Sequence, residues 1–174
     1  MLATTKIITV GNFDLKLNHL LIISILVLAF TVSFLLRSQA ADLGFELNEF
    51  DPFFNYRATQ YIVDNGIGAY LEWNDSLSWY PIGRDVSATS QVMLHLTAAT
   101  TYLIFGGGMD LYEFTILFPV IFASLSAIVI FALVRVIGGT TAGLFSAMLF
   151  SVSIPLLIRS PIGWFKSEPF GLFF

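Results

Sequence analysis

The chain has 174 residues, of which 56% are hydrophobic and only 11% are charged. A soluble domain is typically about 25% charged, so this composition indicates an integral membrane protein. The formal net charge of −4 argues against a nucleic-acid partner, and the absence of cysteine excludes disulfides and thiolate metal ligands.

The first apolar segment covers residues 17–37 and contains no charged residue before Arg37. It is long enough to cross a hydrocarbon core of about 30 Å as a helix. A cleaved signal peptide is the alternative, because Lys6 and Lys16 give the chain a basic start, although the apolar region of a signal peptide has only about 7–15 residues. The basic residues predict that residues 1–16 are cytoplasmic and that the next loop is external.

Two further apolar segments, residues 114–135 and 136–158, also predict transmembrane helices. Gly138 and Gly139 predict the turn between them, because paired glycines interrupt helices. Arg135 lies beside this short connection, which favours the cytoplasmic side.

Residues 86–109 are uncharged and allow two interpretations, a membrane crossing or a helix at the outer surface. Polar and apolar side chains are mixed here, which is more typical of an interfacial or protein-packed helix. A crossing would also turn Arg135 outward and Asp110 and Glu113 inward, against the usual distribution of basic residues. The surface position is therefore favoured.

The predicted fold is an all-α polytopic membrane protein with three complete transmembrane helices and the start of a fourth. External loops are expected over residues 38–113 and 159–168, and residues 169–174 would begin the truncated fourth helix. In the first loop, one apolar face predicts an amphipathic helix from Pro52 to Asn65 and Gly66, formed by Phe54, Ala58, Tyr61 and Ile62.

Two carboxylates, Glu49 and Asp51, follow closely after the first apolar segment. Charges near a membrane are costly unless they are solvated, paired or bound to a metal, so this pair is a candidate functional site. The alternative is a helix start, because acidic residues favour helix N-termini and Pro52 suits a first turn. His95 is predicted to be a packed polar residue, with metal binding as the alternative.

Four motifs now form a recognisable series. They are Glu-Phe-Asp-Pro-Phe-Phe-Asn-Tyr-Arg-Ala-Thr (residues 49–59), Trp-Tyr-Pro-Ile-Gly-Arg (79–84), Gly-Leu-Phe (143–145) and Arg-Ser-Pro-Ile-Gly-Trp-Phe-Lys-Ser-Glu (159–168). This series resembles the N-terminal part of the catalytic subunit of oligosaccharyltransferases, from residue 17 onward, and the motif sequences are most similar to those of archaeal members.

The resemblance implies a membrane glycosyltransferase with a divalent cofactor, Mn²⁺ or Mg²⁺. Its partners would be a lipid-linked oligosaccharide donor on a polyprenyl (dolichyl) phosphate or pyrophosphate, an acceptor polypeptide with Asn-X-Ser/Thr, and the lipid bilayer. The location implied is an archaeal cell membrane, with the active site facing outside.

The resemblance also implies residue roles. Asp51, Glu168 and Arg159 would be catalytic, and Asp51, Glu168 and, less directly, Glu49 would hold the metal. This chain has Lys166 where the family has a carboxylate, and a protonated amine cannot be a metal ligand. Lys166 is then a lineage variant, a partial replacement for the metal's charge, or the mark of an inactive relative.

Two other functions stay open. One is a glycosyltransferase that uses a polyprenyl-phosphate sugar, and the other is a non-catalytic scaffold or pseudoenzyme. The Trp-Trp-Asp-Tyr-Gly motif, with which family members hold the acceptor, does not occur in the sequence. We therefore expect these 174 residues to be an N-terminal fragment that is inactive alone.

Overall fold

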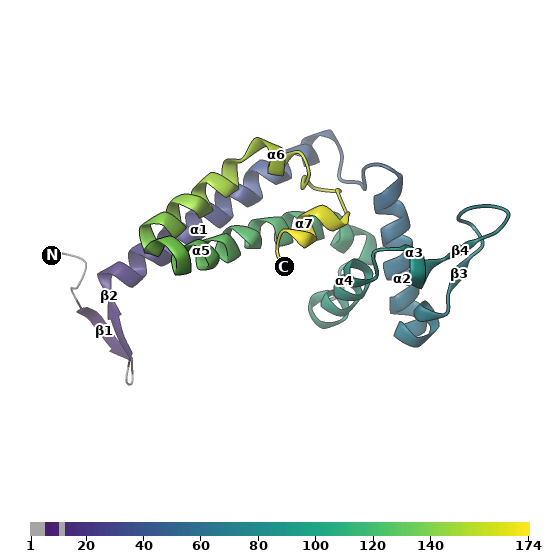
Figure 1. Ribbon diagram of the computed structural model, residues 1–174, viewed down its shortest axis with the longest axis horizontal. Coiled ribbons are helices and arrows are strands. Elements are labelled where there is room, and N and C mark those ends of the chain that lie inside the picture. The colour runs from purple at the N-terminus through teal and green to yellow at the C-terminus, as the bar shows by residue number, and fades with distance from the viewer. Residues whose placement is uncertain (1–5, 11–12) are drawn as a thin grey trace.

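A computed structural model describes residues 6–10 and 13–174, with side chains from residue 16 onward. The described chain is mostly helical, with α1 and α5 at one end and α2 to α4 at the other (Figure 1). The elements are β1 (Lys6–Val10), β2 (Phe13–Lys16), α1 (Leu17–Ser38), the 3₁₀ helix η2 (Gln39–Leu43), α2 (Phe50–Leu71), β3 (Asn74–Asp75), β4 (Arg84–Asp85), α3 (Val86–Thr89), α4 (Val92–Phe105), α5 (Leu111–Val152), α6 (Ile154–Leu157) and α7 (Ser167–Gly171).

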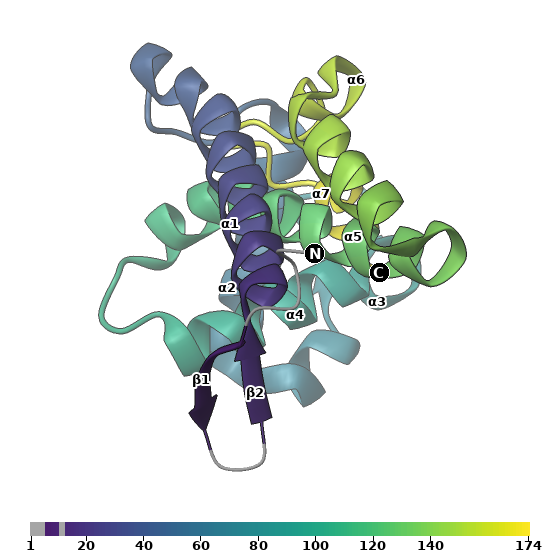
Figure 2. The same ribbon diagram turned by 90° about the vertical axis from the view of Figure 1, so that its left-hand side faces the viewer.

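The segment predicted to be cytoplasmic, residues 1–16, lies partly outside the described residues, which omit 1–5 and 11–12. Its described part is an antiparallel hairpin of β1 and β2, in which Val10 pairs with Phe13. The hairpin leads directly into α1 (Figure 2).

Helix α1 packs against α5 through small residues and leaves many of its large apolar side chains exposed. Ala29 and Ser33 are fully buried, and the Ser151 hydroxyl donates to the Ala29 carbonyl oxygen over 2.8 Å. Val27 and Leu35 on other faces of α1 are each 59% exposed. A helix with this much uncovered apolar surface suits a lipid environment.

Helix α5 consists of two limbs joined at Gly139, at the glycine pair where the sequence predicts a turn. Gly139 has φ 82° and ψ 174°, a conformation that residues with a side chain rarely adopt. The limbs double back on each other (Figure 1). At their crossing a Cβ on Gly143 would lie only 2.8 Å from the Phe131 carbonyl oxygen, so glycine permits the close approach. The first limb continues through Pro119 with helical dihedral angles.

Among the described residues, α1 with η2 and α5 are the two helices long and apolar enough to cross a membrane. Helix α4 has 14 residues, so at 1.5 Å per residue it reaches roughly 21 Å, less than the hydrocarbon core of about 30 Å. This length agrees with the surface interpretation of residues 86–109.

Helix α2 carries the predicted amphipathic pattern. Ala58 and Ile62 are buried against α4, while Phe54 and Tyr61 pack at the edge of the same cluster. Its dihedral angles leave the helical region at Gly66 (φ 84°, ψ 167°), where the sequence predicts the end, although a further helical turn follows as far as Leu71.

Candidate functional site

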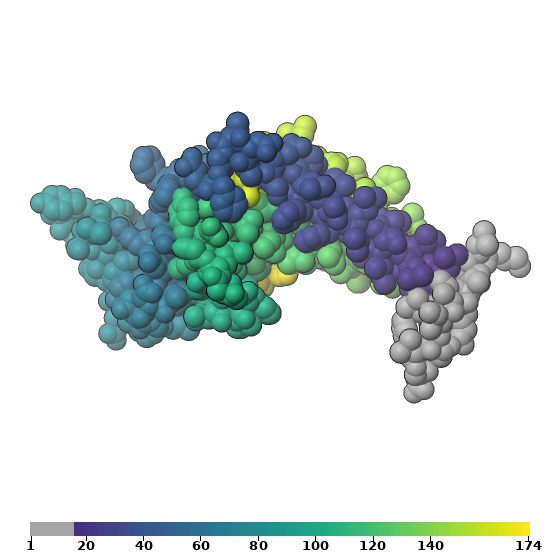
Figure 3. All heavy atoms as spheres, turned by 180° about the vertical axis from the view of Figure 1, so that it is seen from behind, coloured from purple at the N-terminus to yellow at the C-terminus, as the bar shows by residue number. Residues whose placement is uncertain are grey.

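The first and second loops lie against each other. The Asn48 backbone N–H donates to the Gly163 carbonyl oxygen over 3.1 Å, and the Asn48 side chain donates to the Ile162 carbonyl oxygen over 3.0 Å. A Cβ on Gly163 would lie 2.1 Å from the Glu46 carbonyl oxygen, so the contact requires glycine, which is also at φ +77°. In Figure 3 the yellow spheres of the second loop are visible between the blue spheres of the first.

Arg37 connects this pair of loops to helices α1 and α5. Its side chain is 1% exposed, donates from Nε to the Ser160 hydroxyl over 2.8 Å and from Nη1 to the Ser33 hydroxyl over 2.6 Å. Its carbonyl oxygen accepts from the Ile162 N–H over 3.0 Å. The sequence identified Arg37 only as the end of a span. The serine four residues earlier was the one local sign that its guanidinium would turn back into the protein.

Asn55 connects α2, α4 and the second loop. It is 3% exposed; its Nδ2 donates to the Phe165 carbonyl oxygen over 2.8 Å, and its Oδ1 lies 2.9 Å from His95 Nε2. Since the amide oxygen can only accept, His95 carries its proton on Nε2, and Nδ1 accepts from the Tyr70 hydroxyl over 2.7 Å. The one local sign of this role is that Asn55 is a polar residue beside the apolar face of the predicted helix.

The environment of His95 keeps its imidazole neutral. The ring is fully buried, and burial together with the charge of Arg84 lowers its pKa to about 3. Both ring nitrogens are occupied by Asn55 and Tyr70. The prediction that His95 is a packed polar residue is confirmed.

The two candidate carboxylates of the first loop share one cation from the second loop. Lys166 Nζ lies 2.6 Å from Glu49 Oε2 and 3.2 Å from Asp51 Oδ2. The ammonium also lies 4.4 Å from the centre of the Trp164 ring, within the range of a cation–π contact. Burial opposes the charged form, but hydrogen bonds and charge interactions with Glu49 and Asp51 outweigh it, so the pKa of Lys166 is raised above its ordinary value.

These side chains differ in how much solvent they reach. Lys166 is 13% exposed, whereas Glu49 is 53% and Asp51 73% exposed. Asp51 occupies the first turn of α2, as the helix-start interpretation expects, and Glu49 precedes the helix at φ 71°. The helix-start and functional interpretations are therefore compatible, because the first turn presents the Asp51 carboxylate to the second loop.

The other predicted site residues form a separate pair. Arg159 Nη1 lies 3.8 Å from Glu168 Oε1, and the two side chains are 60% and 41% exposed. A solvent-exposed pair of this kind contributes little to stability, so both groups are free to engage another partner. The structure thus brings the two predicted motifs together, but the recorded partner of Asp51 is Lys166 and that of Glu168 is Arg159.

The described residues do not fit a divalent cation. From residue 16 onward, no group of three or more His, Cys, Asp or Glu side chains lies close enough together to hold a metal ion. One oxygen each of Glu49 and Asp51 already accepts from an ammonium, which has no lone pair to offer a metal. The assignment of Mn²⁺ or Mg²⁺ to Asp51, Glu168 and Glu49 stays a prediction.

Hollows flank the N-terminal half of α2. One of about 270 Å³ is lined by Glu49, Phe50 and Asp51, and another of about 130 Å³ includes Asp51, Arg84 and Gln91 in its lining. Asp51 therefore reaches open space on two sides.

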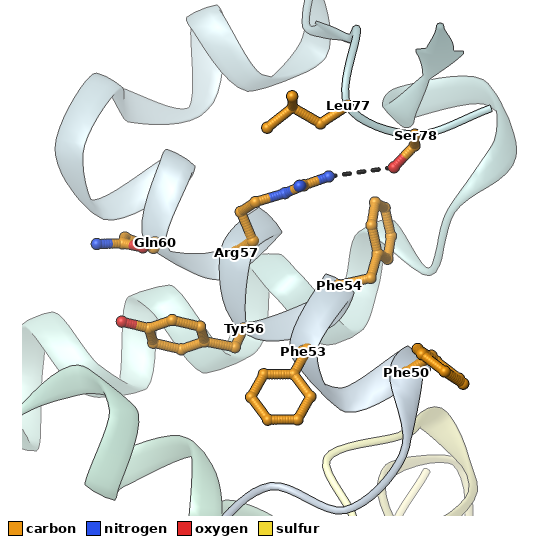
Figure 4. Close-up of a pocket in the computed structure, with 8 residues that line it drawn as sticks. All are labelled: Phe50, Phe53, Phe54, Tyr56, Arg57, Gln60, Leu77 and Ser78. Carbon is orange, nitrogen blue, oxygen red and sulfur yellow. Dashed lines mark hydrogen bonds between the residues drawn. The ribbon is translucent and has the colours of Figure 1, made fainter. Parts of the chain in front are cut away.

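A larger pocket of about 470 Å³ lies on the same half of α2, with aromatic rings along one side (Figure 4). Arg57 crosses it and donates to the Ser78 hydroxyl over 3.1 Å, and it also pairs with the buried Asp75. The lining residues are Phe50, Phe53, Phe54, Tyr56, Arg57, Gln60, Leu77 and Ser78.

The Trp-Tyr-Pro-Ile-Gly-Arg motif forms an exposed apolar tip fixed at its base. Trp79 and Tyr80 are 59% and 89% exposed. The Arg84 guanidinium lies 4.1 Å from the centre of the Phe54 ring and donates to the Thr89 carbonyl oxygen over 2.7 Å. The tip has the composition of a membrane-interface segment.

Apolar helices with exposed surfaces, and charged loops joined at one end of them, define a helical membrane protein. Residues 17–174 match the family model described as Oligosaccharyl transferase STT3, N-terminal. The chain belongs to this family.

Relatives with known names agree with this assignment. The chain is 34% identical over 159 residues to the dolichyl-diphosphooligosaccharide–protein glycosyltransferase subunit stt-3 of Caenorhabditis elegans, a match that covers 88% of this chain and 21% of that protein. It is 33% identical over 180 residues to the corresponding subunit STT3B of Arabidopsis thaliana, covering 99% of this chain and 24% of the relative. The chain thus spans between a fifth and a quarter of the length of these relatives, and corresponds to their N-terminal part.

Proposed function

We propose that this chain is the N-terminal part of an enzyme that transfers an oligosaccharide from a polyprenyl (dolichyl) phosphate or pyrophosphate to asparagine in Asn-X-Ser/Thr. The observation that carries the proposal is the joining of two distant charged loops. The first acidic loop is bonded to the second through Asn48 and Gly163 and through Glu49 and Lys166. Family membership and the names of the relatives support the reaction type.

The acceptor amide is a poor nucleophile, because its nitrogen lone pair is delocalised into the carbonyl group. Lys166 takes one oxygen of Glu49 and one of Asp51, and a carboxylate has about four acceptor positions. The remaining positions accept the two amide N–H groups, turn the amide out of conjugation and favour attack of its nitrogen on the first carbon of the sugar. A bond forms from this nitrogen to that carbon, the bond from the carbon to the phosphate oxygen breaks with its electron pair left on the phosphate, and the proton lost by the amide passes to the released phosphate or to water.

Arg159 suits the leaving group. Its guanidinium is 60% exposed, and within the described part of the chain its ion-pair partner is Glu168 at 3.8 Å, so it is available to donate to phosphate oxygens. Negative charge develops on the phosphate as the sugar leaves, and positioned donors for such charge are usually the largest catalytic contribution. A lipid-linked donor also explains why these groups lie at the end of apolar helices.

We propose three membrane crossings, by α1 and by the two limbs of α5. The limbs are Leu111–Gly138 and, after the break, residues 140–152, which α6 extends to Leu157. With an even number of crossings between them, the two charged loops are on one side, in agreement with the bonds between them. The exposed Arg135 near the turn favours the cytoplasm there and puts the site outside. An archaeal cell membrane stays a prediction, since the relatives reported above are eukaryotic.

The test uses the complete natural protein that contains these residues, with a fluorescent Asn-X-Thr peptide and lipid-linked oligosaccharide. Asp51→Asn keeps the shape but removes the charge, and we expect it to lower kcat by at least about 100-fold, as is typical for loss of one positioned catalytic group. Asp64→Asn is the matched control, because Asp64 is an exposed carboxylate on the same helix. Equal activity of the two variants would contradict the assignment of Asp51.

The same assay separates the remaining functions. Transfer of a single sugar from a polyprenyl-phosphate sugar, without en bloc transfer, would indicate the alternative glycosyltransferase. No glycosylated product with any donor, from a folded wild-type protein, would indicate the non-catalytic scaffold.

A further inference from the structure

We propose that Lys166 is a built-in cation of this site, and that its ammonium stands where a divalent ion would otherwise bind between Glu49 and Asp51. The inference deepens the proposed function, on which its catalytic consequence rests. Its binding consequence depends only on the geometry of the described residues.

The ammonium occupies the centre of the acidic pair. It lies 2.6 Å from one carboxylate oxygen and 3.2 Å from another, and these two carboxylates come from a different loop than the lysine. A cation that binds the carboxylates of the first loop and joins them to the second loop has the role that a bridging metal would have. Here the cation is attached covalently to the second loop.

Neighbouring groups restrict the position of the ammonium from several sides. The Trp164 ring covers it at 4.4 Å, and the lysine is only 13% exposed although both carboxylates are well exposed. The preceding Phe165 is fully buried, and its carbonyl oxygen is held by Asn55 over 2.8 Å. The backbone on the N-terminal side of Lys166 is therefore fixed, which directs the side chain toward the first loop.

Charge balance favours the same conclusion. The carboxylates of Glu49, Asp51 and Glu168 with the ammonium of Lys166 have a formal charge of −2. An aspartate in place of Lys166 would make it −4, and a divalent ion would then restore −2. One lysine thus gives the charge that an additional acidic ligand and a divalent ion would give together.

A divalent ion cannot simply be added to this arrangement. Mg²⁺ requires carboxylate oxygens at about 2.0–2.1 Å, in the space where the ammonium now lies. It would have to displace a cation that already has hydrogen bonds, without gaining a ligand from it. We therefore expect the two loops to stay joined, and glycosylation to continue, when divalent ions are removed.

The test measures Mn²⁺ binding by the complete natural protein in detergent, using the electron paramagnetic resonance signal of free Mn²⁺. We expect the wild type and Lys166→Arg to show no site at this position. Lys166→Asp should gain one Mn²⁺ site and bind at least about 100-fold more tightly than the wild type, because the charge at this one position changes from +1 to −1 within a few ångströms of the ion. The double variant Lys166→Asp/Asp51→Asn should lose that site again.

Two outcomes overturn the inference. One is a wild-type protein that binds one Mn²⁺ and loses it on Asp51→Asn, a result that needs no lysine variant to fold. The other is a folded Lys166→Asp that binds no more Mn²⁺ than the wild type.

Glycosylation in EDTA provides the catalytic readout. Wild-type activity that is retained in EDTA, while that of Lys166→Asp is lost and returns with Mn²⁺, supports the inference. Wild-type activity that needs added Mn²⁺ contradicts it. A wild type that is inactive with and without metal contradicts the proposed function instead, and the Mn²⁺ binding measurements still decide the role of Lys166.

Discussion

Asn55 offers the sharpest test of how the site is assembled, because one buried amide holds both the second loop and α4. In Asn55→Ala the Phe165 carbonyl oxygen loses its 2.8 Å donor, and His95 Nε2 loses its 2.9 Å acceptor. Phe165 and His95 are both fully buried, so neither group has ready access to bulk water.

The expected loss of stability follows from these two groups. A buried polar group left without a partner costs about 1–3 kcal/mol, and water that enters the space of the missing amide will recover part of this. We therefore expect Asn55→Ala to lower the free energy of unfolding by about 2–4 kcal/mol. Local opening of the second loop should become roughly 30-fold more frequent for every 2 kcal/mol lost.

The assay combines thermal unfolding in detergent with hydrogen exchange of residues 160–170. Asn65→Ala is the matched control, because Asn65 lies on the same helix but its hydrogen bond to the Tyr61 carbonyl oxygen is exposed. We expect the control to change stability by less than about 0.5 kcal/mol. If Asn55→Ala behaves like Asn65→Ala, and exchange in the second loop does not increase, the argument that Asn55 holds the site together is refuted.

Three further predictions concern His95 and two close-packed glycines. Because the pKa of His95 is lowered to about 3, the unfolded chain binds a proton below pH ~6.5 that the folded protein does not bind. The free energy of unfolding should therefore fall with decreasing pH by up to about 1.4 kcal/mol per pH unit. His95→Gln should flatten this slope in unfolding experiments at pH 7, 5 and 4. Gly163→Ala should cost about 2–4 kcal/mol and increase hydrogen exchange in both loops, since its Cβ would strike the Glu46 carbonyl at a positive φ. Gly143→Ala should separate the limbs of α5, which should lower the free energy of unfolding by about 1–3 kcal/mol and reduce the unfolding temperature. Gly171→Ala is the control for both glycine variants, because a Cβ there meets nothing within 4 Å. An equal effect in the control would count against the packing argument.

Local sequence patterns predicted much of the helical framework. The apolar run that begins at Leu17 forms α1, the glycine pair produces the break at Gly139, and the face containing Ala58 and Ile62 is buried. Each of these features depends on a few consecutive residues, through hydrophobic periodicity or the conformational freedom of glycine. The motifs also predicted the family, which the comparison confirms.

The sequence could not predict which side chains meet at the site. Glu49 and Lys166 are separated by 117 positions, and Asn55 and Phe165 by 110, so no local pattern records these contacts. They depend on the paths of two loops and on the close approach at Gly163.

The residue types alone thus established a helical membrane protein with acidic residues beside its first long apolar helix, because hydrophobicity and chain breaks act over short stretches. Tertiary structure decided that Lys166, and not Glu168, faces Glu49 and Asp51. The reason is geometric: the buried Phe165 and the hydrogen bond from Asn55 set the direction of the second loop, and the next side chain is therefore directed at the first.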